Sequence, residues 1–204
     1  MFGHKKIKLA VLISGSGSNL QALIDACKDA DYPAEIAVVI SNKANANGLA
    51  RAQKAGIQTH IISHRNYDGR QEFDAALIEA LKPYSPDLIC LAGFMRILSD
   101  DFINSFEGRI LNTHPSLLPK HGGEGMYGMH VHRAAIDAGD NISGCTIHHV
   151  ISEVDRGPVI LQKQVPVMAD DTAETLAARV IEQEHIAYVD AVKMVAEKIL
   201  SSDV

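Results

Sequence analysis

The sequence predicts an α/β fold: an open, mostly parallel sheet with helices on both faces and a mixed C-terminal portion. In the first half of the chain, short runs that are apolar throughout alternate with segments whose apolar residues recur at helical spacing. Runs of this kind are typical of parallel strands that are buried on both faces. After residue 140 two longer candidate strands follow one another without a helix between them, which adds the mixed portion to a Rossmann-like sheet.

Each element follows from its own pattern. Uniformly apolar runs predict five strands in the first half, at residues 7–14, 35–41, 58–63, 86–93 and 108–114. Apolar residues at helical spacing between them predict helices at 19–30, 46–56 and 69–84. The two late strands are expected at 142–151 and 157–167, and a last helix at 172–200, where Asp171 and Glu174 have the spacing of a capping box.

Composition indicates one globular domain over residues 1–204. The chain has 47% hydrophobic and 22% charged residues, which is ordinary for a globular protein of this length. Its formal net charge of −6 argues against a nucleic acid as the main partner, because such binding depends on clustered Lys and Arg. A small ligand is therefore expected.

Three cysteines and the absence of long apolar runs indicate the compartment. Cys27, Cys90 and Cys145 are odd in number, far apart and set among apolar neighbours, which predicts reduced, mostly buried thiols. No apolar run approaches the roughly 20 residues needed to cross a bilayer, and residues 1–14 make a poor signal peptide. We expect a mature chain in the cytoplasm with no membrane partner.

The segment "ISGSGSNLQALIDA" places Gly15 and Gly17 between the first strand and the first helix. Backbone N–H groups at such a turn can bind an anion at the positive end of the helix dipole. The third glycine of the dinucleotide fingerprint is missing, and so are the acidic residue after the second strand and the Gly-Lys-Ser/Thr of a P-loop. The loop is therefore either a site for one phosphate, at Gly17, Ser18 and Asn19, or a turn in which Ser18 or Asn19 only caps the helix.

The segment "RILNTHPSLLPKHGG" ends a predicted strand with Asn112 and His114. Residues two apart in a strand point to the same side, so this is either a polar strand end or half of an active site. Ligands of α/β sheets collect at the carboxyl ends of parallel strands. Residues 15–19, 93–98 and 112–114 all lie at such ends and are expected to border one crevice.

Further polar residues lie between the two late strands. The segment "TIHHVISEVDRGPVI" contains His148, Glu153 and Asp155. A carboxylate in this position is common in turns, and sequence spacing does not show whether Asp155 meets His114. Histidines also occur as His130 with His132 and as His148 with His149, but none has a recognised ligand spacing such as HExxH, so no metal is expected.

Five segments together carry a resemblance to a known family. "VLISGSGSNLQALIDA", "SNKANANGLARAQKAGI", "LAGFMRILS", "LNTHPSLLPK" and "DRGPVILQKQVPV" resemble the folate-dependent phosphoribosylglycinamide formyltransferases, over about residues 7 to 190. The resemblance implies the formyltransferase fold, with a nucleotide-binding half at about 1–105 and a folate-binding and catalytic half at about 106–204. It also implies direct transfer of a formyl group, through a tetrahedral intermediate, from 10-formyltetrahydrofolate to the primary amine of glycinamide ribonucleotide in de novo purine biosynthesis.

The same resemblance implies roles for individual residues. Asn112, His114 and Asp155 match the catalytic set of the family, and His148 is a candidate for orienting the carboxylate of Asp155. The ribonucleotide is expected at Gly17, Ser18 and Asn19 for the phosphate and at Glu184. The folate site is expected at Arg70, Met95, Arg96, Ile97 and Leu98, with Val150 on the other side.

One segment departs from the family pattern. Residues 120–132, "KHGGEGMYGMHVH", are several residues longer than the usual loop and lack its Pro-Gly. The extra glycines suggest a mobile flap beside the substrate site, and no contacts are assigned to it.

Three other functions remain as alternatives. Methionyl-tRNA formyltransferase uses similar residues but needs a basic C-terminal domain, for which this acidic chain has no room. Formyltetrahydrofolate hydrolase is also similar, although it usually carries an N-terminal regulatory domain. A nucleotide-binding module without activity would need the glycine loop but not Asn112, His114 and Asp155 together. The sequence leaves a monomer and a homodimer equally open.

Overall fold

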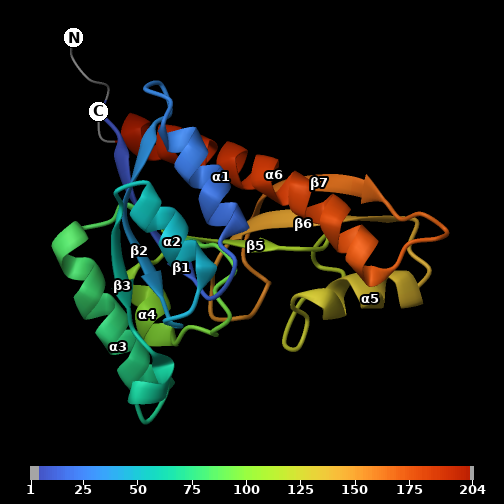
Figure 1. Cartoon of the computed structure of the whole chain (residues 1–204), viewed down its shortest axis with the longest axis horizontal. Coiled ribbons are helices and arrows are strands. Elements are labelled where there is room, and N and C mark those ends of the chain that lie inside the picture. The colour runs from blue at the N-terminus through green and yellow to red at the C-terminus, as the bar shows by residue number, and fades with distance from the viewer. Residues whose placement is uncertain (1–4, 203–204) are drawn as a thin grey trace.

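A computed structural model describes residues 5–202, which build a seven-stranded sheet in the order β3-β2-β1-β4-β5-β6-β7 (Figure 1). Strands β1 to β5 are parallel, whereas β6 runs antiparallel to β5 and β7 antiparallel to β6. The predicted fold class, including its mixed C-terminal portion, is confirmed. The strands are β1 (Ile7–Ile13), β2 (Ala34–Ser41), β3 (Gln58–Ile61), β4 (Leu88–Leu91), β5 (Ile110–His114), β6 (Ile142–His149) and β7 (Val159–Pro166).

Helices cover both faces of the sheet, and each face has its own apolar core. The first face packs against α1 (Ser18–Cys27), α2 (Asn47–Lys54), α5 (Met129–Asp137) and α6 (Ala173–Ser202). The second face packs against α3 (Arg70–Leu81) and α4 (Asp100–Ser105). Short 3₁₀ turns lie at His64–Asn66 and Lys82–Tyr84. In Figure 1, α6 runs alongside α1 and across β6 and β7.

The central strand β1 shows why its sequence is apolar throughout. Leu9, Val11 and Ile13 belong to the core beneath α1 and α6, and the alternate residues Ala10 and Leu12 belong to the core beneath α3. All five side chains are fully buried. A strand between two layers of helices has no polar face, because its alternating side chains all enter a core.

The structure adds one helix to the expected elements and fixes the position of another. Helix α4 has six residues, of which only Phe102 and Ile103 are buried, so it is too short to show a helical period. Its N-cap is Ser99, whose hydroxyl accepts a hydrogen bond from the N–H of Phe102. Helix α5 follows the glycine-rich loop at Met129–Asp137. Neither helix was delimited by the periodicity.

The predicted capping box at Asp171 and Glu174 is wrong. Thr172 and Thr175 cap α6 instead, because the N–H of each residue donates to the hydroxyl of the other. The carboxylate of Asp171 is directed to Arg179, with which it makes two hydrogen bonds at 2.7 and 2.9 Å. The Asp171 carboxylate thus pairs with a cation, and its Oδ1 also accepts a hydrogen bond from the hydroxyl of Thr175.

Tyr188 joins α6 to the two strands that carry the candidate site. Its side chain is fully buried, and its hydroxyl lies 3.1 Å from the carbonyl oxygen of Leu91 and 3.2 Å from that of Leu111. Leu91 is the last residue of β4, and Leu111 is the second residue of β5. The hydroxyl thus joins both strands to α6.

Replacing Tyr188 by Phe is expected to lower the free energy of unfolding by about 1–2 kcal/mol, because it removes a buried hydrogen-bond donor. Urea denaturation measures the change. Tyr127→Phe is the control, since that ring is 53% exposed and should not alter the unfolding midpoint. Equal midpoints for both variants and the unmodified protein would show that the buried hydroxyl contributes nothing.

Candidate active site

Segments after β1, β2 and β4 are joined at the carboxyl edge of the sheet by Ser14. Its hydroxyl donates to Oδ1 of Asn42 at 2.7 Å and accepts a hydrogen bond from the N–H of Met95 at 2.8 Å. Both Ser14 and Asn42 are buried. Sequence reasoning missed them as site residues, although two polar residues that directly follow buried strands were the available signal. Side-chain hydrogen bonds thus hold together the segments that follow β1, β2 and β4.

The glycine loop after β1 packs against the first turn of α2. Gly17 has a φ of +69°, and a Cβ atom on it would lie only 2.5 Å from Cα of Gly48. The N–H of Gly48 also donates to the carbonyl oxygen of Gly15. Gly17 precedes α1, and no side chain caps that helix. Ser18 and Asn19 therefore do not have the alternative capping role, and the first-turn N–H groups have no partner within the helix.

Asn19 instead reaches the last helix. Its Nδ2 donates to Oε2 of Glu184 at 2.8 Å, and the hydroxyl of Thr113 donates to the same oxygen at 3.3 Å. Burial raises the pKa of Glu184, and these two hydrogen bonds partly oppose that shift. Two residues that the family resemblance assigned to the ribonucleotide thus meet. Thr113 was missed, because its side chain points to the opposite side of β5 from its neighbours.

His148 is a buried neighbour of Asn112. Its Nδ1 lies 2.9 Å from the carbonyl oxygen of His149, so that nitrogen carries a proton and donates it. Nε2 of the neutral ring then accepts a hydrogen bond from Nδ2 of Asn112, 3.2 Å away. Burial lowers the pKa of His148 and so favours the neutral ring. One Nδ2 proton of Asn112 remains for another acceptor.

The expected contact between His148 and Asp155 is longer than the contact between His148 and Asn112. Nε2 of His148 lies 3.7 Å from Oδ1 of Asp155, beyond hydrogen-bond distance. In the tautomer set by the neighbouring carbonyl this nitrogen has no proton to donate. The hydrogen-bond partner of His148 in this network is therefore Asn112, and the carboxylate is a more distant neighbour.

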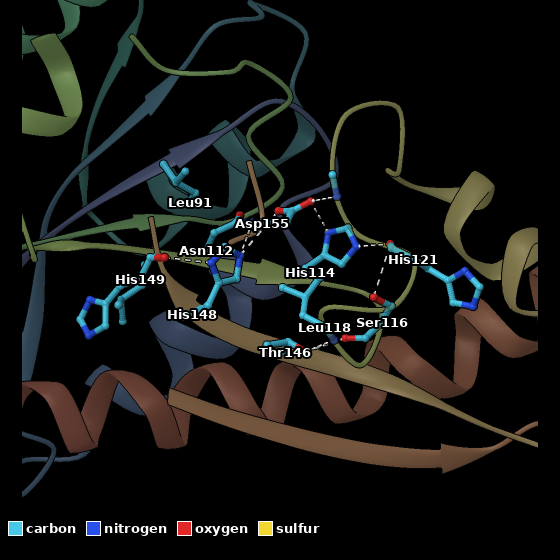
Figure 2. A network of polar contacts seen from close by, with 12 residues as sticks. Leu91, Asn112, His114, Ser116, Leu118, His121, Thr146, His148, His149 and Asp155 are labelled. Carbon is cyan, nitrogen blue, oxygen red and sulfur yellow. Dashed lines mark hydrogen bonds and ion pairs between the residues drawn. The ribbon is translucent and has the colours of Figure 1, made fainter. Parts of the chain in front are cut away.

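His114 and Asp155 face each other in the same network (Figure 2). Nδ1 of His114 lies 3.4 Å from Oδ2 of Asp155, and Nε2 lies 2.8 Å from the carbonyl oxygen of His121. Nε2 donates to that carbonyl oxygen, and Nδ1 faces the carboxylate. The two side chains are 5% and 9% exposed. The structure brings together the two residues whose meeting sequence spacing did not show.

Asp155 is held by the turn between β6 and β7. It has a φ of +57°, and its Oδ2 accepts a hydrogen bond from the N–H of Gly123 at 3.0 Å. Two residues later the turn packs against β6 so closely that a Cβ atom on Gly157 would lie 1.7 Å from the carbonyl oxygen of His149. The carboxylate is thereby fixed in place by two backbone segments.

The residues expected at the folate site lie on the second face of the sheet. Leu98 and Val150, from opposite sides of the expected site, contact the same apolar core. Met95 and Ile97, which precede Leu98 in the same segment, are 47% and 41% exposed. Arg70 and Arg96 are also exposed. An apolar, partly exposed segment with two guanidinium groups fits a flat ligand that carries carboxylates.

Asp74 holds the C-terminal end of this segment by a hydrogen bond. It is almost fully buried, and its Oδ2 accepts a hydrogen bond from the N–H of Ser99, directly after Leu98. Burial raises the pKa of Asp74, although the nearby charges of Arg70 and Arg96 oppose the shift. The carboxylate thus fixes the end of the exposed segment.

The long loop that begins at Lys120 differs from the expectation, which assigned it no contacts. The carbonyl oxygen of His121 and the N–H of Gly123 bind the two facing residues, His114 and Asp155. These groups belong to the backbone, and residue types along the loop gave no signal of them. The start of the loop is therefore part of the candidate site.

Three further features bear on ligands and surroundings. Within residues 5–202 the structure has no group of three or more His, Cys, Asp or Glu side chains placed to hold a metal ion. None of the helices in that range is long and apolar enough to span a membrane. The cysteines are free, with Cys90 and Cys145 buried and Cys27 partly buried, as predicted.

Comparison with known proteins gives one consistent result. Residues 7–192 match the family described as Formyl transferase. The phosphoribosylglycinamide formyltransferase of Escherichia coli (strain K12) is 50% identical over 182 residues, which cover 89% of this chain and 84% of that protein. The structure of glycinamide ribonucleotide transformylase 1 from Symbiobacterium toebii has a TM-score of 0.90 and 45% identity, covering 96% of this chain and 90% of that one.

Other relatives are much longer. The trifunctional purine biosynthetic protein adenosine-3 of Gallus gallus is 50% identical over 191 residues, which cover 94% of this chain. Those residues make up 18% of the Gallus gallus protein. The chain thus corresponds to less than a fifth of that relative.

Proposed function

The chain belongs to the formyl transferase family, and we propose that it transfers the formyl group of 10-formyltetrahydrofolate to the primary amine of glycinamide ribonucleotide, a step of de novo purine biosynthesis. The observation that carries this proposal is the grouping of Asn112, His114 and Asp155 at one sheet edge, between a glycine loop and an exposed apolar segment. The similarity to phosphoribosylglycinamide formyltransferases over most of the chain supports it.

The residue types suit a direct transfer. The amine of the ribonucleotide attacks the formyl carbon, and the carbonyl oxygen gains negative charge as the tetrahedral intermediate forms. The free Nδ2 proton of Asn112, whose amide is oriented by His148, donates to this oxygen. One such donor is typically worth about 3 kcal/mol of transition-state stabilisation.

His114 and Asp155 handle the protons of the intermediate. The protonated ring, with Nδ1 toward Asp155, stabilises the oxyanion and delivers a proton as the folate amine leaves. The carboxylate stabilises the imidazolium and positions a water molecule, which takes the proton from the attacking amine and passes it to the carboxylate. General acid–base help of this kind contributes about 10² to 10⁴-fold to a rate.

Each proposed substrate site takes residues from both halves of the chain. The ribonucleotide phosphate binds the N–H groups of Gly17, Ser18 and Asn19, and Glu184 accepts hydrogen bonds from the ribose. The folate lies between Met95–Leu98 and Val150, with Arg70 toward its carboxylates. We assign no nucleic acid or membrane partner, place the enzyme in the cytoplasm, and expect a monomer or homodimer.

An absorbance assay tests the proposal. Purified protein is mixed with 10-formyltetrahydrofolate and glycinamide ribonucleotide, and the folate product is followed by its ultraviolet absorbance. Product formation that depends on the ribonucleotide is expected. Formate release that does not depend on it would mean that water is the acceptor and that the chain is a hydrolase.

Replacing Glu184 by Gln is expected to raise Tm at pH 7 and to raise KM for the ribonucleotide about tenfold or more. The gain in stability follows from the raised pKa, which makes the ionised form unfavourable in the folded chain. That penalty is full above the folded pKa and disappears as pH falls to the ordinary value of 4.5, so the difference in Tm should shrink toward acid pH. The loss of affinity corresponds to one charge-assisted hydrogen bond, about 1.5–3 kcal/mol.

Thermal unfolding between pH 4 and 8 and steady-state kinetics measure the two effects. Glu197→Gln is the matched control, because Glu197 is exposed on the same helix and should change neither quantity. A lower Tm for Glu184→Gln at pH 7 would contradict the assignment of a strained buried charge.

A further inference from the structure

The first residues of the long loop lie directly against the facing pair of His114 and Asp155 (Figure 2). The carbonyl oxygen of His121 accepts the hydrogen bond from Nε2 of His114, and the N–H of Gly123 donates to Asp155. Both contacts use backbone atoms. Their aim therefore depends on the conformation of residues 120–123 and on whatever holds that conformation.

The conformation at His121 is one that side chains rarely adopt. Its φ of +52° lies in the left-handed region, which a bulky residue enters only when its surroundings require it. The residues that follow His121 allow many conformations, since Gly122, Gly123 and Gly125 are among them. An anchor outside the loop is needed to keep the carbonyl oxygen directed at the imidazole.

Asp140 provides that anchor from the turn between α5 and β6. Its Oδ2 lies 2.7 Å from Nε2 of His121, and its Oδ1 pairs with Nζ of Lys120. The carboxylate is only 8% exposed and the His121 side chain 13%. The hydroxyl of Ser116 also donates to the carbonyl oxygen of Lys120 at 2.6 Å. One carboxylate thus binds the side chains of two consecutive residues.

The charge state of Asp140 matches this role. The hydrogen bond from Lys120 is the main cause that lowers the pKa of this carboxyl, and the contact with His121 adds to it. The carboxylate is therefore ionised at neutral pH and can hold both partners at once.

We infer that Asp140 is a positioning residue for His114. By clamping Lys120 and His121 it directs the His121 carbonyl oxygen at Nε2, and this turns Nδ1 of the ring toward Asp155 and the reacting groups. Asp140 itself does not reach those groups. The inference rests on the proposed function, because it assumes that the orientation of His114 limits formyl transfer.

Replacing Asp140 by Ala is expected to lower kcat about 10 to 100-fold, since a misplacement of a reacting group by about 1 Å costs that much. KM for both substrates should stay within about twofold, because no binding contact is removed. Asp140→Glu, which keeps the charge, should restore part of the rate. The matched control is Asp171→Ala, which removes another nearly covered carboxylate, paired with Arg179, outside the site. It should leave kcat unchanged.

A second variant covers the case in which Asp140→Ala does not fold. His121→Asn breaks the contact with Asp140, and Asn adopts the left-handed conformation more readily than other side chains. It should lose kcat to a similar extent. The double variant should lose no more than the larger single loss, because both changes break one chain of contacts. Losses that multiply, or a normal kcat in either single variant, would overturn the inference.

Nitrogen-15 NMR of the imidazole groups distinguishes a failure of the Asp140 clamp from a failure of the proposed function. In the unmodified protein, Nε2 of His114 should carry a proton that is hydrogen-bonded and protected from exchange, and Asp140→Ala should abolish that protection. This signal needs no substrate. If the unmodified protein transfers no formyl group, the proposed function fails while the signal still tests the clamp. If transfer is normal and the His114 signal is unchanged in Asp140→Ala, the clamp alone is wrong.

Discussion

His114→Ala is expected to lower kcat by about 10² to 10⁴-fold, the range in which general acid–base groups contribute. The physical reason is that the ring lies between two acceptors, with Nδ1 at 3.4 Å from Asp155 and Nε2 fixed by a backbone carbonyl, so that it holds a proton next to the reacting groups. The methyl side chain of alanine can neither carry that charge nor donate a proton. KM should change little.

Single-turnover kinetics with the folate donor measure this loss apart from substrate binding. His60→Ala is the control, because His60 is exposed on the edge strand β3, where its ring contacts Tyr84. It should keep the normal rate. If His114→Ala retains near-normal kcat while folded by circular dichroism, His114 is not the proton donor and the mechanism must rely on Asn112.

Asp155→Asn is the second variant with a large expected effect, a loss of at least about 10²-fold in kcat. The amide has the size of the carboxylate and can still accept the hydrogen bond from the N–H of Gly123, so the turn should remain in place. What disappears is the negative charge opposite Nδ1 of His114. An imidazolium without that charge is less stable, and the relayed proton has no base to receive it.

Asp190→Asn provides the comparison for Asp155→Asn. Asp190 is 49% exposed on α6 and pairs with Lys163, so its neutralisation removes one charge without touching the site. We expect normal turnover from it, and an unchanged Tm from both variants. A normal kcat in Asp155→Asn would show that Asp155 is not the base of the proton relay. A loss of kcat accompanied by unfolding would show that Asp155 has a structural role alone.

Periodicity was sufficient for most of the fold and insufficient for two details. The strands buried on both faces are predictable because every side chain along them is apolar, as in β1. Helix α4 is not, since it is too short to show a period. The cap of α6 lies at Thr172 rather than Asp171, because Arg179 competes for the carboxylate, and that competitor is visible only in three dimensions.

The candidate site divides in the same way. Asn112 and His114 could be paired from their spacing along one strand, and the first loop from its glycines. The meeting with Asp155 depends on how the turn after β6 folds back, and neither strand encodes that distance locally. The contacts of His121 and Gly123 use backbone atoms, so no residue type announces them.

The alternation at the end of β5 also limits how this chain can evolve. Asn112 and His114 lie on one side of the strand, where Asn112 contacts His148, and Thr113 between them faces Glu184. Deleting or inserting one residue in β5 would exchange these faces, because the side-chain period of a strand is two. Length changes should therefore be tolerated near residues 125–128, beyond the clamped start of the loop, and be absent from residues 110–114 in functional relatives. A library of single-residue insertions across both segments would reveal that contrast.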